Sequence, residues 1–65
     1  MNTQGNQLPT ILTIDDEETI RHSFRAFFED LDFEVLEADS GLTGIETFMN
    51  NRPDLVLVDL NMPQM

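Results

Sequence analysis

Residues 55–58 read Leu-Val-Leu-Val and are followed directly by Asp59. A strand that is apolar at every position is typical of a parallel sheet that helices cover on both faces. The residue after such a strand lies at its carboxyl end, which is where open α/β sheets bind their ligands. This stretch therefore predicts a covered strand and places an acid, Asp59, at the edge of the sheet where a site is expected.

Two further strands are predicted upstream of this one. Residues 10–14 (TILTI) are short and rich in β-branched side chains, which favours a strand. Residues 33–38 (FEVLEA) mix apolar side chains with two acids, Glu34 and Glu37. Charge is one device that protects an open sheet edge, so this segment is expected to be a partly exposed edge strand.

Two helices are predicted between the strands. Residues 18–31 carry an apolar stripe at steps of three and four, and we expect its aromatic members to lie in the core. This stripe consists of Ile20, Phe24, Phe27, Phe28 and Leu31. Residues 41–50 follow Asp39 and Ser40, both good N-cap types, and carry a second stripe. That stripe consists of Leu42, Ile45, Phe48 and Met49. Gly44 costs about 1 kcal/mol in a helix against Ala, which suggests that close packing requires it.

The element order is strand-helix-strand-helix-strand, which is typical of a parallel α/β sheet. Right-handed crossovers with one helix on each face require the strand order 2-1-3, with residues 10–14 in the centre. The 65 residues allow one small domain. We expect residues 1–9, which are polar and contain Gly5 and Pro9, to form a flexible tail, and residues 10–65 to form the folded part.

The composition excludes several classes of partner. Thirteen acids against three arginines give a net charge of −10, which repels nucleic acid and anionic membranes. The chain has no cysteine for a disulfide, no apolar stretch approaching a membrane span, and no signal-peptide pattern at its start. We therefore expect a cytoplasmic protein that favours cations, metals or basic protein surfaces.

Three acids are predicted to converge at one edge of the sheet. Asp15 and Asp16 follow the first strand, and Asp59 follows the third. Neighbouring strands lie about 4.8 Å apart. Two unit charges about 5 Å apart repel by about 3 kcal/mol at an effective dielectric constant near 20, so the cluster favours a bound cation. Mg²⁺ prefers such oxygen ligands, and a carboxylate can act as a nucleophile toward phosphorus, with Asp59 the best candidate.

At this point the chain resembles a known family. Ile14-Asp15-Asp16-Glu17 after a short strand, and residues 59–63 (DLNMP) after Leu-Val-Leu-Val, are similar to the receiver domains of two-component response regulators. The resemblance covers residues 10–65 and implies a flavodoxin-like sheet. Either motif alone is a weak signal, whereas both in register on the expected elements are specific.

The resemblance implies a role for each matching residue. Asp59 is expected to be the phosphoacceptor, and Asp16 a direct Mg²⁺ ligand. Asp15 is expected to act on the metal through water, and the backbone carbonyl of Asn61 to complete the metal site. The implied donor is a phosphohistidine on a sensor histidine kinase or a histidine phosphotransfer protein. The chain is not expected to be an enzyme beyond assisting its own phosphorylation.

The chain departs from the family by ending at Met65, so the resemblance implies that it is the N-terminal half of a receiver domain. Receiver domains continue with two more strands and three more helices, which carry a Ser/Thr and a Lys that contact the phosphoryl group. This chain has no lysine. We therefore do not expect it to switch on phosphorylation by itself.

Other interpretations remain open. The half-domain could be a non-signalling interaction module that associates through its third strand, since an open apolar strand invites pairing. An aspartate-based phosphatase is disfavoured, because such enzymes usually have a second Asp two residues after the nucleophile and this chain has Asn61 there. The Asp-Asp-Glu turn lacks the glycines of a dinucleotide site. His22 is expected to be an exposed helix residue, and Arg21 and Arg25 to make weak pairs with acids of their own helix.

Overall fold

The computed structural model describes residues 8–60 and contains all five predicted elements. They are, in chain order, β1 (Thr10–Ile14), α1 (Glu18–Asp30), β2 (Glu34–Ala38), α2 (Gly41–Asn51) and β3 (Leu55–Val58). Each observed end lies within one residue of the expected end. The predicted tail lies mostly outside the described residues. No helix among residues 8–60 is both long enough and apolar enough to cross a membrane.

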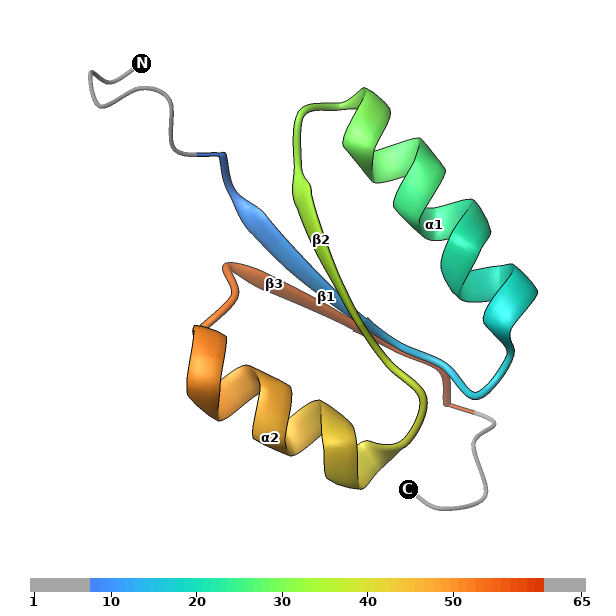
Figure 1. Cartoon of the computed structure of the whole chain (residues 1–65), viewed down its shortest axis with the longest axis vertical. Helices are drawn as coiled ribbons and strands as arrows, with labels where there is room; N and C mark the ends of the chain where they lie inside the picture. Colours follow the sequence, from blue (N-terminus) through green and yellow to red (C-terminus); the bar gives the residue numbers. More distant parts are fainter. Residues whose placement is uncertain (1–7, 61–65) are drawn as a thin grey trace.

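The three strands form one parallel sheet in the order β2-β1-β3, as predicted. Figure 1 shows α1 and α2 on opposite faces of this sheet. Ile14 at the end of β1 is in register with Ala38 of β2 and Val58 of β3. The loops that follow β1 and β3 therefore leave the sheet at the same edge, side by side.

The core lies along the central strand. Ile11 and Leu12 are fully buried, and Ile14, Val35 and Ala38 are nearly so. Strand β1 has a neighbour on each side and a helix over each face, which explains why its apolar side chains are the most deeply buried.

Helix α2 packs on the sheet through its glycines. Gly41 and Gly44 are its buried residues. A Cβ atom built on Gly44 would lie 2.5 Å from Cδ1 of Ile14, so the predicted need for close packing at Gly44 is confirmed. The hydroxyl of Ser40 accepts a hydrogen bond from the Thr43 N–H at 3.2 Å, which makes Ser40 the N-cap.

The expectation that the stripe of α1 forms the core is wrong for the described residues. No residue of α1 is buried, and Phe27 is 59% exposed. Phe28 is half-buried, and its ring contacts those of Phe24, Phe27 and Phe33. The reason is geometric: α1 lies over β2 and β1, and a three-stranded sheet is too narrow to cover the whole stripe.

The sequence of β3 is typical of a strand covered on both faces, but in the described residues the strand is partly exposed, as expected of an apolar strand at an open sheet edge. Leu55 is 47% exposed and Val58 is 37% exposed, while Val56 and Leu57 are half-buried. Strand β3 is an edge strand of the described sheet, so one side of its backbone has no neighbouring strand there. Its apolar sequence therefore exceeds what the described fold can bury.

Candidate functional site

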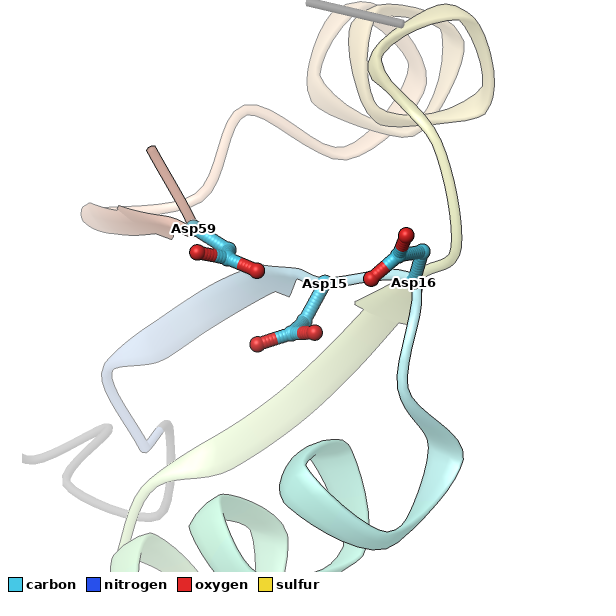
Figure 2. A group of neighbouring side chains, drawn as sticks. All are labelled: Asp15, Asp16 and Asp59. Atoms are coloured by element: carbon cyan, nitrogen blue, oxygen red, sulfur yellow. The ribbon is translucent and has the colours of Figure 1, made fainter. Parts of the chain in front are cut away.

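Three aspartates meet at the carboxyl edge of the sheet. Asp15 and Asp16 lie in the loop between β1 and α1, and Asp59 follows β3 (Figure 2). One carboxylate oxygen from each of them lies within 4.8 Å of the other two. Asp15 is buried, Asp59 is half-buried and Asp16 is exposed. The cluster therefore has a buried base and a side that is open to solvent, as a ligand site requires.

The backbone of the sheet fixes where these carboxylates lie. The Asp15 N–H donates to the carbonyl of Ala38 at 3.0 Å, and the Asp59 N–H donates to the carbonyl of Ile14 at 3.0 Å. Each of these bonds extends the parallel ladder by one residue beyond the strand. Asp15 and Asp59 are thus tied to neighbouring strands at the same level, which brings their side chains together.

The Asp15 side chain is held as well. Its Oδ1 accepts a hydrogen bond from the Glu17 N–H at 2.9 Å. Glu17 is the N-cap of α1, and its own side chain makes no capping bond. The Asp15 carboxylate therefore accepts a hydrogen bond from one of the first free N–H groups near the helix start, which orients the carboxylate.

The cluster fits a hard divalent cation. Two ligands on opposite sides of an octahedral Mg²⁺ ion at 2.0–2.1 Å are about 4.2 Å apart. The observed distance of up to 4.8 Å between the carboxylate oxygens is slightly larger. Small side-chain rotations would bring the oxygens to that spacing, and a water between one carboxylate and the ion would accommodate the larger distance. All three donors are carboxylate oxygens, which Mg²⁺ prefers to nitrogen or sulfur. Asp15, Asp16 and Asp59 would hold the ion, and the exposed side leaves room for water or phosphate oxygens.

The predicted fourth ligand cannot be placed. Asn61, whose backbone carbonyl is expected to complete the metal site, lies outside the described residues. The roles of Asp15, Asp16 and Asp59 as metal ligands and phosphoacceptor stay predictions, now with a geometry that allows them.

A network of two arginines and one glutamate lies beside the cluster and differs from what was expected. Arg21 Nε donates to Glu37 Oε1 at 3.0 Å, and Arg25 Nε donates to Glu37 Oε2 at 2.6 Å. Arg25 also pairs with Glu29 of its own helix at 3.3 Å, as predicted. The prediction of weak pairs within the helix is nevertheless wrong for Arg21, whose partner is Glu37 on β2. The two arginines thereby link α1 to the sheet.

The environment of Glu37 favours its charged form. Burial by itself would raise the pKa of Glu37, but the hydrogen bonds and charges of Arg25 and Arg21 outweigh it and hold that pKa below 4.5. A signal for this network was present in the sequence. Arg21 and Arg25 are four residues apart, on one helix face. Glu37 is two residues from the apolar Val35, so both side chains point to the same face of β2, the face on which α1 lies.

An apolar groove of about 410 Å³ runs from the acidic cluster between α1 and β3. Ile20, Phe24 and Leu57 lie along it, and Asp15 and Asp59 lie at one end. Thr13 also lines this groove, and within the described chain its buried hydroxyl has no hydrogen-bond partner. Nothing in the sequence distinguishes this hydroxyl, because Thr is common in β-strands.

Comparison with known proteins identifies the family to which this arrangement belongs. Residues 11–65 match the family described as "Response regulator receiver domain". The autoinducer 1 sensor kinase/phosphatase LuxN of Vibrio campbellii is 38% identical over 61 residues, which are 94% of this chain and 7% of that protein. The chemotaxis protein CheY of Listeria monocytogenes is 36% identical over 56 residues, which are 85% of this chain and 47% of that protein.

The fold agrees with a solved relative. A crystal structure of a response regulator receiver domain protein from Clostridium thermocellum superimposes with a TM-score of 0.85 and 38% sequence identity. The match covers 89% of this chain and 48% of that one, so the chain spans about half the length of these shorter relatives. The family match over nearly the whole chain, and the shared fold with its acidic edge, show that this chain belongs to the response regulator receiver domain family.

Proposed function

We propose that this chain is the phosphoacceptor part of a receiver domain, in which Asp59 takes a phosphoryl group in the presence of Mg²⁺. The observation that carries the proposal is the meeting of Asp15, Asp16 and Asp59 within 4.8 Å at the carboxyl edge of a receiver-type sheet. The proposed donor is a phosphohistidine on a sensor histidine kinase or a histidine phosphotransfer protein. Two relatives, LuxN and the Helicobacter pylori protein CheAY, bear the name of sensor kinases.

Asp59 is the proposed nucleophile because it is half-buried at the end of β3, within reach of both other acids. One of its oxygens forms a bond to phosphorus while the P–N bond of the donor breaks. The electron pair of that bond passes to the ring nitrogen of the donor, which takes up a proton. A bound Mg²⁺ would offset the negative charge that gathers as the phosphoryl group meets the three carboxylates.

Asp15 and Asp16 are proposed to hold the cation rather than to attack. Asp15 is buried, and its Oδ1 is engaged by the Glu17 N–H, so that oxygen is a poor nucleophile. Asp16 is exposed and can turn toward the ion. We propose Asp16 as a direct ligand, Asp15 as a ligand through water, and the Asn61 carbonyl as a further ligand.

We further propose that switching in response to phosphorylation needs chain beyond these residues, and that residues 10–65 form the N-terminal half of a receiver domain. The Clostridium thermocellum structure and the Listeria monocytogenes CheY sequence are each about twice as long as this chain, and this chain has no lysine to pair with a phosphoryl group. Phosphorylation of this chain alone should then be slow. We place it in the cytoplasm, with no enzymatic activity beyond aiding its own phosphorylation.

The test is incorporation from phosphoramidate, a small donor with a P–N bond, followed by the intact mass of the full chain. We expect a gain of one phosphoryl group with Mg²⁺ and none with a chelator. Asp59→Asn should abolish the gain. Asp54→Asn, at the other end of β3, should leave it intact. Equal incorporation in the Asp59→Asn and wild-type chains would refute the proposal.

A second candidate function is association through β3. The observation that favours it is the exposure of Leu55 and Val58 on an edge strand. Sedimentation of the chain over a wide concentration range tests it. Association requires that size rise with concentration and that Leu55→Lys, a charge on the edge, prevent the rise. Leu42→Lys is the control, because Leu42 is also exposed but lies on α2. A monomer at every concentration excludes this function.

A further inference from the structure

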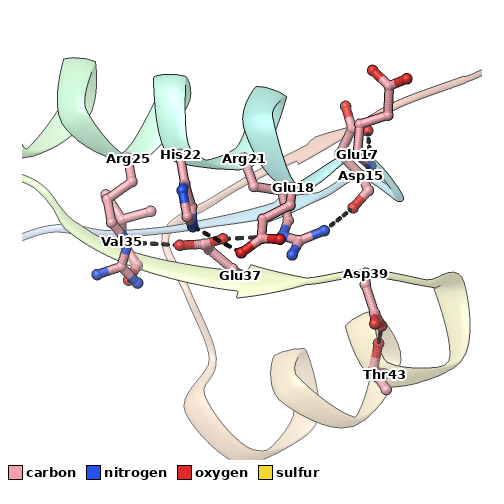
Figure 3. Close-up of polar contacts among 10 residues, drawn as sticks. All are labelled: Asp15, Glu17, Glu18, Arg21, His22, Arg25, Val35, Glu37, Asp39 and Thr43. Atoms are coloured by element: carbon pink, nitrogen blue, oxygen red, sulfur yellow. Dashed lines mark hydrogen bonds and ion pairs between the residues drawn. The ribbon is translucent and has the colours of Figure 1, made fainter.

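Arg21 touches the backbone of the acidic site as well as Glu37. Its Nη1 donates to the carbonyl oxygen of Asp15 at 2.8 Å, while its Nε donates to Glu37 Oε1 at 3.0 Å (Figure 3). The side chain is only 15% exposed. A planar guanidinium that makes two bonds in different directions has little freedom to turn. The position of the Asp15 carbonyl is therefore coupled to β2 through one rigid group.

This bond completes the fixation of Asp15. The N–H of Asp15 is bound to Ala38, and its carboxylate to the Glu17 N–H. The carbonyl, which Arg21 holds, is the link to Asp16. The orientation of that peptide group sets the direction in which the Asp16 side chain leaves the loop. Arg21 thus acts on the exposed member of the cluster without touching its carboxylate in any described contact.

Arg25 is a natural comparison, because it also binds Glu37 from α1 but makes its other contacts away from the acidic loop. It donates to Glu37 Oε2 at 2.6 Å and to the Val35 carbonyl at 3.2 Å. It is 42% exposed, and no described contact joins it to Asp15 or Asp16. Both arginines therefore fasten α1 to β2, but only Arg21 reaches the loop that carries the acids.

We propose that Arg21, held by Glu37, is a positioning residue that sets the geometry of the Asp15–Asp16 loop for cation binding. This inference rests on the proposed function and adds a residue outside the acidic cluster to it. Residues that hydrogen-bond to metal ligands fix the orientation of those ligands. Removing such a residue typically lowers the affinity of the site for the metal by about 10- to 100-fold.

A role of Arg21 through its charge and a role through the position of the Asp15 carbonyl predict opposite changes in Mg²⁺ affinity when Arg21 is removed, which makes the proposal testable. A cation beside the site repels Mg²⁺, so if Arg21 acted through charge alone, its removal would tighten Mg²⁺ binding. Glu37 offsets that charge at contact distance. If Arg21 acts by holding the Asp15 carbonyl, its removal loosens the loop and weakens binding.

The experiment is a calorimetric titration of Mg²⁺ into the full chain and its variants. Arg21→Met should weaken Mg²⁺ binding by about 10-fold. Arg25→Met should leave the Mg²⁺ affinity close to that of the wild type, because Arg25 makes no described contact with the loop that carries Asp15 and Asp16. Arg21→Lys keeps the charge and can still pair with Glu37, but one ammonium group cannot reproduce the two fixed hydrogen bonds that the planar guanidinium makes to Glu37 and to the Asp15 carbonyl. It should retain the fold and still bind Mg²⁺ more weakly than the wild type.

Several outcomes overturn the inference. They are tighter binding by Arg21→Met, wild-type affinity in Arg21→Lys, and equal losses in the Arg21 and Arg25 variants. If any one of these outcomes occurs while the wild type binds Mg²⁺ and is phosphorylated at Asp59, the positioning role of Arg21 is wrong and the proposed function stands. A wild-type chain that neither binds Mg²⁺ nor accepts phosphate overturns both.

Discussion

Asp16→Asn should stabilise the chain when no metal is bound and destabilise it relative to the wild type when Mg²⁺ is saturating. The substitution keeps the shape of the side chain and removes one charge from the cluster. Asp16 has two like-charged neighbours, Asp15 and Asp59, with carboxylate oxygens within 4.8 Å. Removing its charge therefore relieves two repulsions in the metal-free protein and removes one cation ligand in the metal-bound protein.

The magnitude follows from that separation. Two unit charges 4.8 Å apart repel by about 3.5 kcal/mol at an effective dielectric constant of 20, and by about 0.9 kcal/mol in water. Asp16 is exposed, so the value for water is the better guide, and salt lowers it further. We expect a gain of about 1–2 kcal/mol from the two pairs together. For a chain this small, about 1 kcal/mol shifts Tm by about 4–8 °C.

The assay is thermal unfolding followed by circular dichroism at low ionic strength, first with a chelator and then with Mg²⁺. The control is Glu46→Gln, which removes one charge from an exposed position on α2, away from the cluster. Without metal, Asp16→Asn should melt several degrees above Glu46→Gln. With Mg²⁺ the wild type should gain more than Asp16→Asn. Equal melting of the two variants under both conditions would show that the three carboxylates neither repel one another nor share a cation.

Three further predictions concern the surroundings of the site. Thr13→Val removes a buried hydroxyl that has no described partner, so it should raise the free energy of unfolding by about 1 kcal/mol in urea denaturation; a loss would show that the hydroxyl is bonded. Gly44→Ala gains helix propensity but overpacks Ile14, for a net loss of about 1 kcal/mol. Adding Ile14→Val should recover part of this loss, and additive losses would contradict the contact. The pKa of Glu37 is lowered by folding, so the stability it gives is present above pH 4.5 and is lost as the pH falls through the folded value. Glu37→Gln should therefore reduce the fall in the free energy of unfolding at acid pH. An unchanged dependence of that free energy on pH would refute the pairing of Glu37 with Arg21 and Arg25.

The sequence was sufficient for the architecture, because each element carries its own local signal. The β-branched run of β1, the Ser40 cap and the apolar run of β3 predict elements from neighbouring residues alone. The strand order then follows from the handedness of crossovers. The convergence of the three aspartates followed in turn, because parallel strands end at the same edge.

Burial was harder to predict, because it depends on how much sheet is available to each helix. The apolar stripe of α1 indicates which face is apolar and carries no information about whether that face is covered. Phe27 is therefore exposed despite its place in a regular stripe. The bond between Arg21 and Glu37 joins residues 16 apart, and its geometry depends on how α1 lies across β2. The sequence pattern indicates that these charges can face each other, but the packing of α1 on β2 decides whether they bond.

The central claim is that the acidic edge of the sheet makes Asp59 a phosphoacceptor. Fragmentation mass spectrometry of the full chain, after treatment with phosphoramidate and Mg²⁺, tests it most directly because it locates the phosphoryl group. The account predicts one modified residue, Asp59, with a bond that hydroxylamine cleaves, as expected of an acyl phosphate. A phosphoryl group found on His22 or another residue, or one that resists hydroxylamine, would contradict it.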